Sequence, residues 1–135
     1  MENAKFKLES YKFTHAFLNI KEDTSLLNLD FKPNGVFYPN NKSFKLEFLF
    51  QAKDDASKED IVKVNCVAWF LFQDINKFED IPDYFYANSI AILFPYVRAF
   101  VSTLTLQANV PPIVLPTLNL FSLQSSLQQN TVVAE

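Results

Sequence analysis

The residue types that most often carry out chemistry in proteins are scarce in this chain of 135 residues. Its only histidine, His15, alternates with Phe13 and Phe17, which favours a half-buried strand position over a catalytic one. Its only cysteine, Cys66, has no base near it in the sequence and shares the phase of apolar neighbours, which is typical of a buried structural thiol. These two residues are a weak basis for a nucleophile and its base.

Phosphate-binding and metal-binding sites also find little support in the residue types. Gly35 is the only glycine, which excludes a glycine-rich phosphate loop. The clustered acidic residues lack metal-ligand spacing and are typical of solvated loops: Glu22-Asp23, Asp54-Asp55, Glu59-Asp60 and Glu79-Asp80. We therefore expect no catalytic residue, no metal and no cofactor, and we interpret the chain as a binding protein without enzymatic activity.

The overall composition is that of a globular domain rich in phenylalanine. With 49% hydrophobic and 20% charged residues, the chain differs from disordered proteins, and its 15 phenylalanines predict a dense aromatic core or an aromatic surface. The net charge of −3 and the scattering of lysines among acids argue against nucleic-acid binding.

A single cysteine allows no internal disulfide, and MENAKFKLES lacks the apolar stretch of a secretory signal, so we expect a cytoplasmic protein.

Alternating apolar residues predict four strands, at 5–20, 25–38, 43–53 and 60–73. The first strand changes phase near Ser10, which predicts a bulge. The second is interrupted at Pro33 and Gly35, as is typical of an irregular or edge strand. The fourth is apolar on both faces over its second half, where Val67 and Trp69 join the inward residues. Both faces should be covered there, and another subunit would supply the second cover.

The stretch SIAILFPYVRAFVSTLTL is apolar almost all the way round a helix that we predict at 89–107. A membrane span is disfavoured because Pro95 and Arg98 would lie near the middle of the hydrocarbon. One stripe can cover a sheet, formed by Ile90, Leu93, Val97, Val101 and Leu104. The apolar residues left over are Ile92, Phe94, Tyr96, Phe100 and Leu106. They require a second partner, and another copy of the chain explains them more simply than a ligand.

The residues on either side of this helix predict its first turn and the elements C-terminal to it. Asn88 or Ser89 is the expected cap, which puts Pro95 in the second helical turn, where proline is tolerated. An extended connector is predicted at 110–120 because of its three prolines. A second helix is predicted at 120–129, and a tail at 130–135.

Four strands followed by two helices predict a single α+β domain over residues 1–135. We expect a four-stranded antiparallel sheet with both helices packed on one of its faces. No internal repeat or linker in the sequence indicates a second domain.

The stretch NSIAILFPYVRAFVSTLTLQANVPPIVLPTLNL, at 88–120, resembles the SecB family of protein-export chaperones. The resemblance rests on the run Ile-Leu-Phe-Pro-Tyr at 92–96 with Arg98 two residues further on, and on Leu-Asn-Leu at 118–120. The order of the predicted strands also agrees with that family, so the resemblance extends over most of the chain.

The resemblance implies an ATP-independent holdase chaperone, assembled as a dimer of dimers with long helices packed between the dimers. It also implies hydrophobic grooves for unfolded clients, lined by the second strand and its preceding loop and by the second helix and its connector. The implied groove residues are Leu26, Leu27, Leu29, Phe31, Val114, Leu115, Leu118, Phe121 and Leu123. The expected oligomer interface consists of the five left-over helix residues together with Val67 and Trp69.

Several alternatives for the biological role stay open at this level. Export members of the family dock the translocase motor SecA through an acidic patch, whereas the exposed phase of the fourth strand here offers Lys63 and Asn65. SecB-like proteins also occur beside toxin–antitoxin pairs, where the client is an unstable antitoxin. From another class, a structural or adaptor subunit could use the same surface for one fixed partner. A small-molecule carrier lacks a set of polar anchors.

Overall fold

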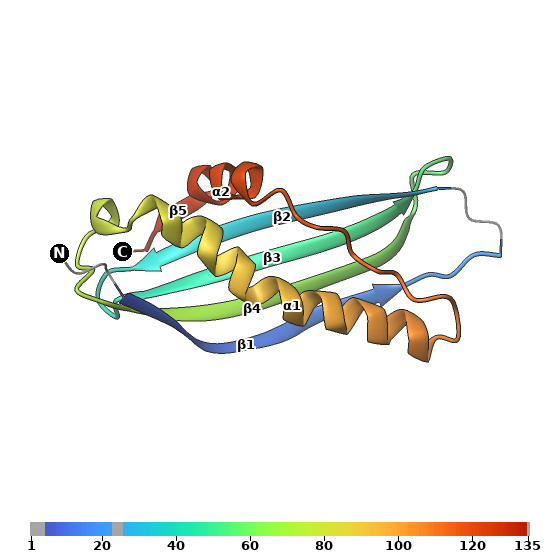
Figure 1. The fold of residues 1–135 in the computed structure, drawn as a ribbon, viewed down its shortest axis with the longest axis horizontal. Helices are drawn as coiled ribbons and strands as arrows, with labels where there is room; N and C mark the ends of the chain where they lie inside the picture. Colours follow the sequence, from blue (N-terminus) through green and yellow to red (C-terminus); the bar gives the residue numbers. More distant parts are fainter. Residues whose placement is uncertain (1–4, 23–25, 135) are drawn as a thin grey trace.

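The computed structural model describes residues 5–22 and 26–134, so the predicted start of the second strand at residue 25 lies outside the described residues. All four predicted strands and both helices form, and one further short strand was not predicted (Figure 1). In chain order the elements are β1 (Lys5–Leu18), β2 (Leu27–Tyr38), β3 (Ser43–Asp54), β4 (Asp60–Gln73), the 3-10 helix η1 (Phe78–Asp80), α1 (Asp83–Gln107), α2 (Leu120–Gln129) and β5 (Thr131–Val133).

The sheet is mixed and has five strands, which corrects the predicted four-stranded antiparallel sheet. Its order is β1-β4-β3-β2-β5, and β5 runs parallel to β2 whereas the other pairs are antiparallel. The Gly35 amide donates to the Asn130 carbonyl (3.2 Å) and the Ala134 amide donates to the Phe37 carbonyl (2.8 Å). A strand of three residues is too short for alternation to reveal, so the segment 130–135 had been expected to be a tail.

Two bulges in β1 decide which of its residues face the helices. The pairing with β4 shifts between Leu8 and Ser10, as predicted, and shifts again between Phe13 and His15, which was not predicted. The second shift turns His15 away from the face that Phe13 occupies, because each slip of one residue reverses the side-chain direction. His15 is consequently exposed, not half-buried as its alternation with phenylalanine had suggested.

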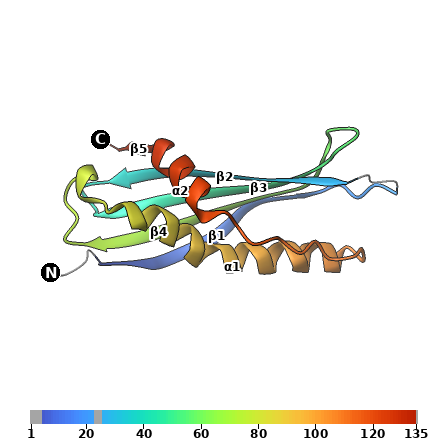
Figure 2. The ribbon, with the colours of Figure 1, turned by 45° about the horizontal axis from the view of Figure 1, so that its top comes forward.

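Both helices lie on the same face of the sheet (Figure 2). Alternate residues of β3 and β4 form the floor of the core, and the stripe predicted on α1 covers it: Ile90, Leu93, Val97 and Val101 are fully buried and Leu104 is half-buried. Phe85 lies at the centre of an aromatic cluster, with ring centroids 4.8 Å from Phe6, 4.9 Å from Phe44 and 4.7 Å from Phe72. Many of the phenylalanines therefore pack in the core of the domain.

Helix α1 begins at Asp83, with Pro82 as its N-terminal cap, and not at the predicted position 89. Ser89 lies inside the helix, fully buried, and its hydroxyl donates to the Tyr86 carbonyl (3.0 Å). Pro95 therefore lies in the middle of a helix of 25 residues and not in its second turn. Because proline has no amide hydrogen, the carbonyl of Ala91 lacks its usual intrahelical donor. By length and composition alone, α1 could cross a membrane; in this structure it is the helix that covers the sheet.

Gly35 is required where β5 meets the sheet. A Cβ atom at this position would collide with the ring of Phe44 and would lie 2.7 Å from the Thr131 hydroxyl. We expect Gly35→Ala to lower the free energy of unfolding by about 1–3 kcal/mol, because the ring and β5 must both move. Urea denaturation measures this change, and Asn34→Ala, at an exposed neighbour, should change it by less than about 0.5 kcal/mol. Equal stability of the two variants would contradict the packing described here.

Candidate binding groove

A cleft of mixed polar and apolar lining lies between β2, α2 and the connector that joins the two helices. It measures about 340 Å³, and its apolar lining comes from Leu29 and Phe31 on β2, Leu118 on the connector and Leu123 on α2. Polar groups border it: Asp30, Thr117, Asn119, Ser122 and Ser126. We call this the β2–α2 groove. About half of its lining residues are apolar and half are polar, so a ligand could bury apolar side chains there and also meet polar groups.

Local structure positions each wall of this groove. Strand alternation points Leu29 and Phe31 toward the helices. The connector is held on α1, because the Ser102 hydroxyl donates to the Ile113 carbonyl (3.0 Å) and the Ile113 amide donates to the Thr105 hydroxyl (3.0 Å). At the start of α2, the Asn119 side chain accepts a hydrogen bond from the Ser122 amide (3.2 Å), which caps the helix.

The predicted groove residues divide into four groups. Leu29, Phe31, Leu118 and Leu123 line the β2–α2 groove, although Leu123 is only 9% exposed. Leu27 lines a second cleft of about 300 Å³ beside Ile20 and Ile113. Three others point outward and are strongly exposed, namely Leu26, Val114 and Phe121. Leu115 is 1% exposed and belongs to the core, so it is not offered to a ligand in this structure.

The residues predicted at an oligomer interface are partly covered by their own sheet. Phe100 stacks on Phe13 with ring centroids 4.1 Å apart, Tyr96 lies 4.4 Å from Tyr11, and Phe94 lies 6.0 Å from Phe31. Trp69, on the opposite face of the sheet, lies 5.4 Å from Tyr38, while Val67 is half-buried. Ile92 and Leu106 are exposed, and so is Tyr96 despite its contact with Tyr11. The need for a second copy is therefore smaller than the sequence pattern indicated, and the interface stays a prediction.

A cleft on the other side of the connector was missed from the sequence. It measures about 230 Å³ and lies between α1 and the connector, lined by Ala91, Phe94, Pro95, Arg98, Thr117, Leu118 and Leu120. We call it the α1 cleft. Leu118 lines both clefts, so the connector separates two adjacent depressions. The spacing of Phe94, Pro95 and Arg98, which is that of one helical face, was the signal available in the sequence.

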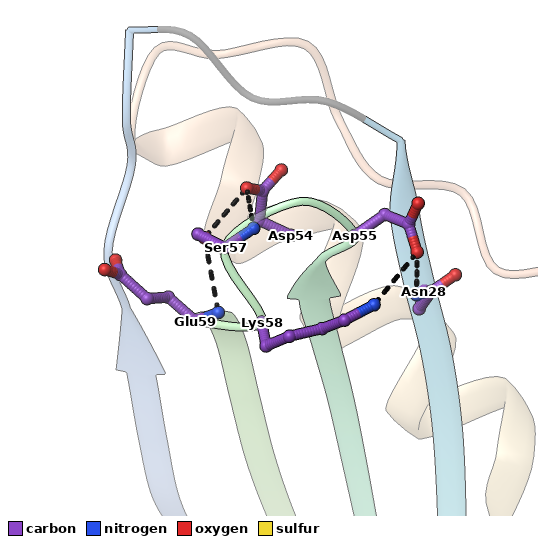
Figure 3. A network of polar contacts seen from close by, with 6 residues as sticks. All are labelled: Asn28, Asp54, Asp55, Ser57, Lys58 and Glu59. Carbon is purple, nitrogen blue, oxygen red and sulfur yellow. Dashed lines mark hydrogen bonds and ion pairs between the residues drawn. The ribbon is translucent and has the colours of Figure 1, made fainter.

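The loop between β3 and β4 is tied to the start of β2 by a polar network (Figure 3). The Asn28 side chain donates to the Asp55 carboxylate (2.6 Å), which also pairs with Lys58 (3.4 Å). These contacts, the hydrogen bond first, lower the pKa of Asp55. Asp54 is buried and accepts hydrogen bonds from the amide and hydroxyl of Ser57. Asp54 is therefore not the solvated loop charge that the sequence predicted, because it is buried and accepts two hydrogen bonds within the loop.

Two buried groups make the stability of the fold sensitive to alkaline pH. Burial raises the pKa of the Cys66 thiol from 9.0 to about 11. Burial and the negative charge of Asp83 raise the pKa of Tyr86 from 10.0 to about 12. In the unfolded chain both groups lose their protons at lower pH than in the folded chain, so deprotonation favours unfolding.

The contribution of these two groups to the free energy of unfolding is therefore expected to be constant below pH 9. Between pH 9 and 12 it is expected to fall. Urea denaturation at successive pH values measures this decline. Tyr86→Phe should make the decline above pH 10 smaller, because phenylalanine does not titrate, and should leave the contribution of Cys66 between pH 9 and 11. A decline of the same size in Tyr86→Phe as in the wild type would contradict the assignment to this tyrosine.

Among residues 5–22 and 26–134, no three or more His, Cys, Asp and Glu side chains gather in a way that could hold a metal ion. The cysteine thiol is fully buried among apolar residues of the core.

Comparison with solved structures supports the fold, whereas comparison of sequences names no family for it. No protein-family model matches the chain. Over 78 residues it is 36% identical to an uncharacterized protein of Methanocaldococcus jannaschii, a match that covers 57% of this chain and 50% of that protein. The chain thus spans about half the length of the curated relative that it matches.

Two solved structures share the architecture. The SecB-like chaperone Rv1957 of Mycobacterium tuberculosis, in complex with a ChAD peptide from the antitoxin HigA1, superimposes with a TM-score of 0.65 at 18% identity, covering 84% of this chain and 91% of that one. A protein of unknown function from Streptococcus agalactiae gives a TM-score of 0.53 at 12% identity, covering 86% and 100%. The fold of this chain is therefore SecB-like, in agreement with the resemblance seen in its sequence.

Proposed function

We propose that this chain is a SecB-like holdase chaperone that binds non-native polypeptide segments without ATP. The observation that carries the proposal is the β2–α2 groove, in which Leu29, Phe31 and Leu118 line a cleft beside an extended connector. The solved SecB-like chaperone with the same fold was determined with an antitoxin peptide bound, which supports a polypeptide as the ligand class.

The proposed binding depends on burial of apolar side chains rather than on catalysis. Each leucine or phenylalanine of a client that leaves water contributes about 1.5–3 kcal/mol, less the ordering of the segment. Since this contribution needs no particular partner geometry, many unrelated sequences can bind. Folded proteins bury the same side chains in their own cores and would be poor ligands, which gives selectivity for non-native chains.

The proposal extends to assembly and role. Ile92 and Leu106 remain exposed on α1, which supports the packing of helices between copies in a cytoplasmic homotetramer. The client is either a preprotein bound for export or an unstable antitoxin. The outer face of β4 carries Lys63 and Asn65, and the Asn65 amide donates to Thr14 (2.8 Å). The Asn65 amide also donates to the Glu47 carboxylate (3.5 Å), so lysine and carboxylate are mixed on this surface, which favours the antitoxin role over delivery to SecA.

The proposal is tested by suppression of aggregation. A chemically denatured, aggregation-prone enzyme is diluted into buffer with and without the protein, and light scattering is followed with and without ATP. Equal suppression in both conditions is expected. Aggregation that proceeds unchanged would favour the second candidate, a dedicated adaptor subunit that binds one fixed partner through the same surface.

A further inference from the structure

Arg98 is an isolated positive charge in the α1 cleft. It is the only charged residue between Asp83 and the last described residue, Ala134, so α1 beyond its first residue, the connector, α2 and β5 contribute no carboxylate. Within the described part of the chain, Arg98 forms no ion pair with any acidic side chain. A guanidinium presents five donors in a planar fork that fits a carboxylate, and here those donors are available.

The same cleft has apolar walls and one unusual backbone carbonyl. Ala91 and Pro95 both line it, and Pro95 cannot donate an amide hydrogen to the Ala91 carbonyl. The cleft therefore combines an available cation with apolar walls from Phe94, Leu118 and Leu120, next to a carbonyl that lacks its usual helical donor. A polypeptide segment supplies matching groups for the cation and the walls: a carboxylate and an apolar side chain.

Because Leu118 lines both clefts, a segment that occupies the β2–α2 groove can continue across the connector into the α1 cleft. We propose that the α1 cleft is a second subsite for the same polypeptide, selecting an acidic residue next to an apolar one, with Arg98 binding the carboxylate. This inference rests on the proposed polypeptide-binding function and adds a sequence preference to it.

The test compares two labelled peptides with the full chain. Each is a 12-residue peptide of alternating leucine and serine, one with a central aspartate and the other with asparagine there. Fluorescence anisotropy at low salt is expected to show about fivefold tighter binding of the aspartate peptide, since the pair is exposed to solvent on one side. The preference should shrink at about 0.5 M salt, because mobile ions screen exposed charges.

Two variants test whether Arg98 causes the preference for the aspartate peptide. In Arg98→Gln the two peptides should bind equally, because the preference for aspartate over asparagine depends on the guanidinium charge. Lys63→Gln removes one positive charge from the opposite face of the sheet and should keep the preference. A preference that survives in Arg98→Gln, or that is absent from the wild type, would overturn the subsite.

The remaining outcomes are also decisive. If a second copy of the chain supplied the carboxylate, Arg98→Gln would change the oligomer mass and leave the peptide preference intact, against the inference. If neither peptide bound the wild type, the proposed function would fail and this subsite with it. Binding of both peptides with equal affinity would overturn the subsite alone and leave the proposed function standing.

Discussion

The double variant Leu118→Asp with Phe121→Asp is expected to weaken the binding of unfolded polypeptide by about 100-fold or more. Leu118 lines both clefts, and Phe121 is 82% exposed on α2 beside them. Two lost apolar contacts of about 1.5 kcal/mol or more each correspond to this factor, since every 1.4 kcal/mol changes the affinity tenfold. Two carboxylates would in addition have to be desolvated by an apolar client.

Phe121 is exposed, whereas Leu118 is half-buried against the core, so circular dichroism must first show that the double variant is folded. A matched control is Phe17→Asp with Val132→Asp, at two exposed apolar positions outside the groove. Anisotropy titration with a labelled unfolded polypeptide measures both variants, and light scattering reports their mass. Unchanged affinity in the first variant with an intact oligomer would place the groove elsewhere.

Phe85→Ala is expected to lower the free energy of unfolding by about 3–5 kcal/mol. The Phe85 ring is fully buried where α1 begins, and its neighbours from β1, β3 and β4 include Phe6, Phe44 and Phe72. Removing it leaves a cavity that rigid neighbouring rings cannot fill, and it uncouples the first turns of α1 from the sheet. This change is a large share of the stability of a small domain.

Urea denaturation followed by circular dichroism measures the effect of Phe85→Ala. Phe121→Ala makes the same chemical change at an exposed position and should alter the stability by less than about 0.5 kcal/mol. If both variants unfolded at the same urea concentration, the aromatic cluster around Phe85 would not be the centre of the core.

The sequence predicted the strands well because alternation reports directly which residues face the core. In β3, Phe44, Leu46, Phe48 and Phe50 are all buried, as their spacing indicated. β1 was harder, because its second bulge between Phe13 and His15 reverses the phase without a glycine or proline to mark it. The start of α1 was missed because Ser89 resembles a cap, although the structure buries it within the helix.

The candidate site was predictable only in part. Family resemblance pointed to Leu29, Phe31 and Leu118, and the structure brings these together in one cleft. Leu115 carries the same type of side chain on the same connector, but the course of an extended connector has no fixed period, so its burial could not be read from spacing. The pairing of Phe94, Tyr96 and Phe100 with β-strand aromatics likewise depends on tertiary contacts.

The most direct test of the proposed chaperone function is a calorimetric titration of the purified protein with one unfolded, unrelated polypeptide, with the mass of the complex measured by light scattering. We predict tight binding without nucleotide, a negative change in heat capacity from burial of apolar surface, and an assembly larger than the 15.6 kDa protomer. An assembly that gives no binding to the unfolded chain would contradict the chaperone account and leave only its SecB-like fold.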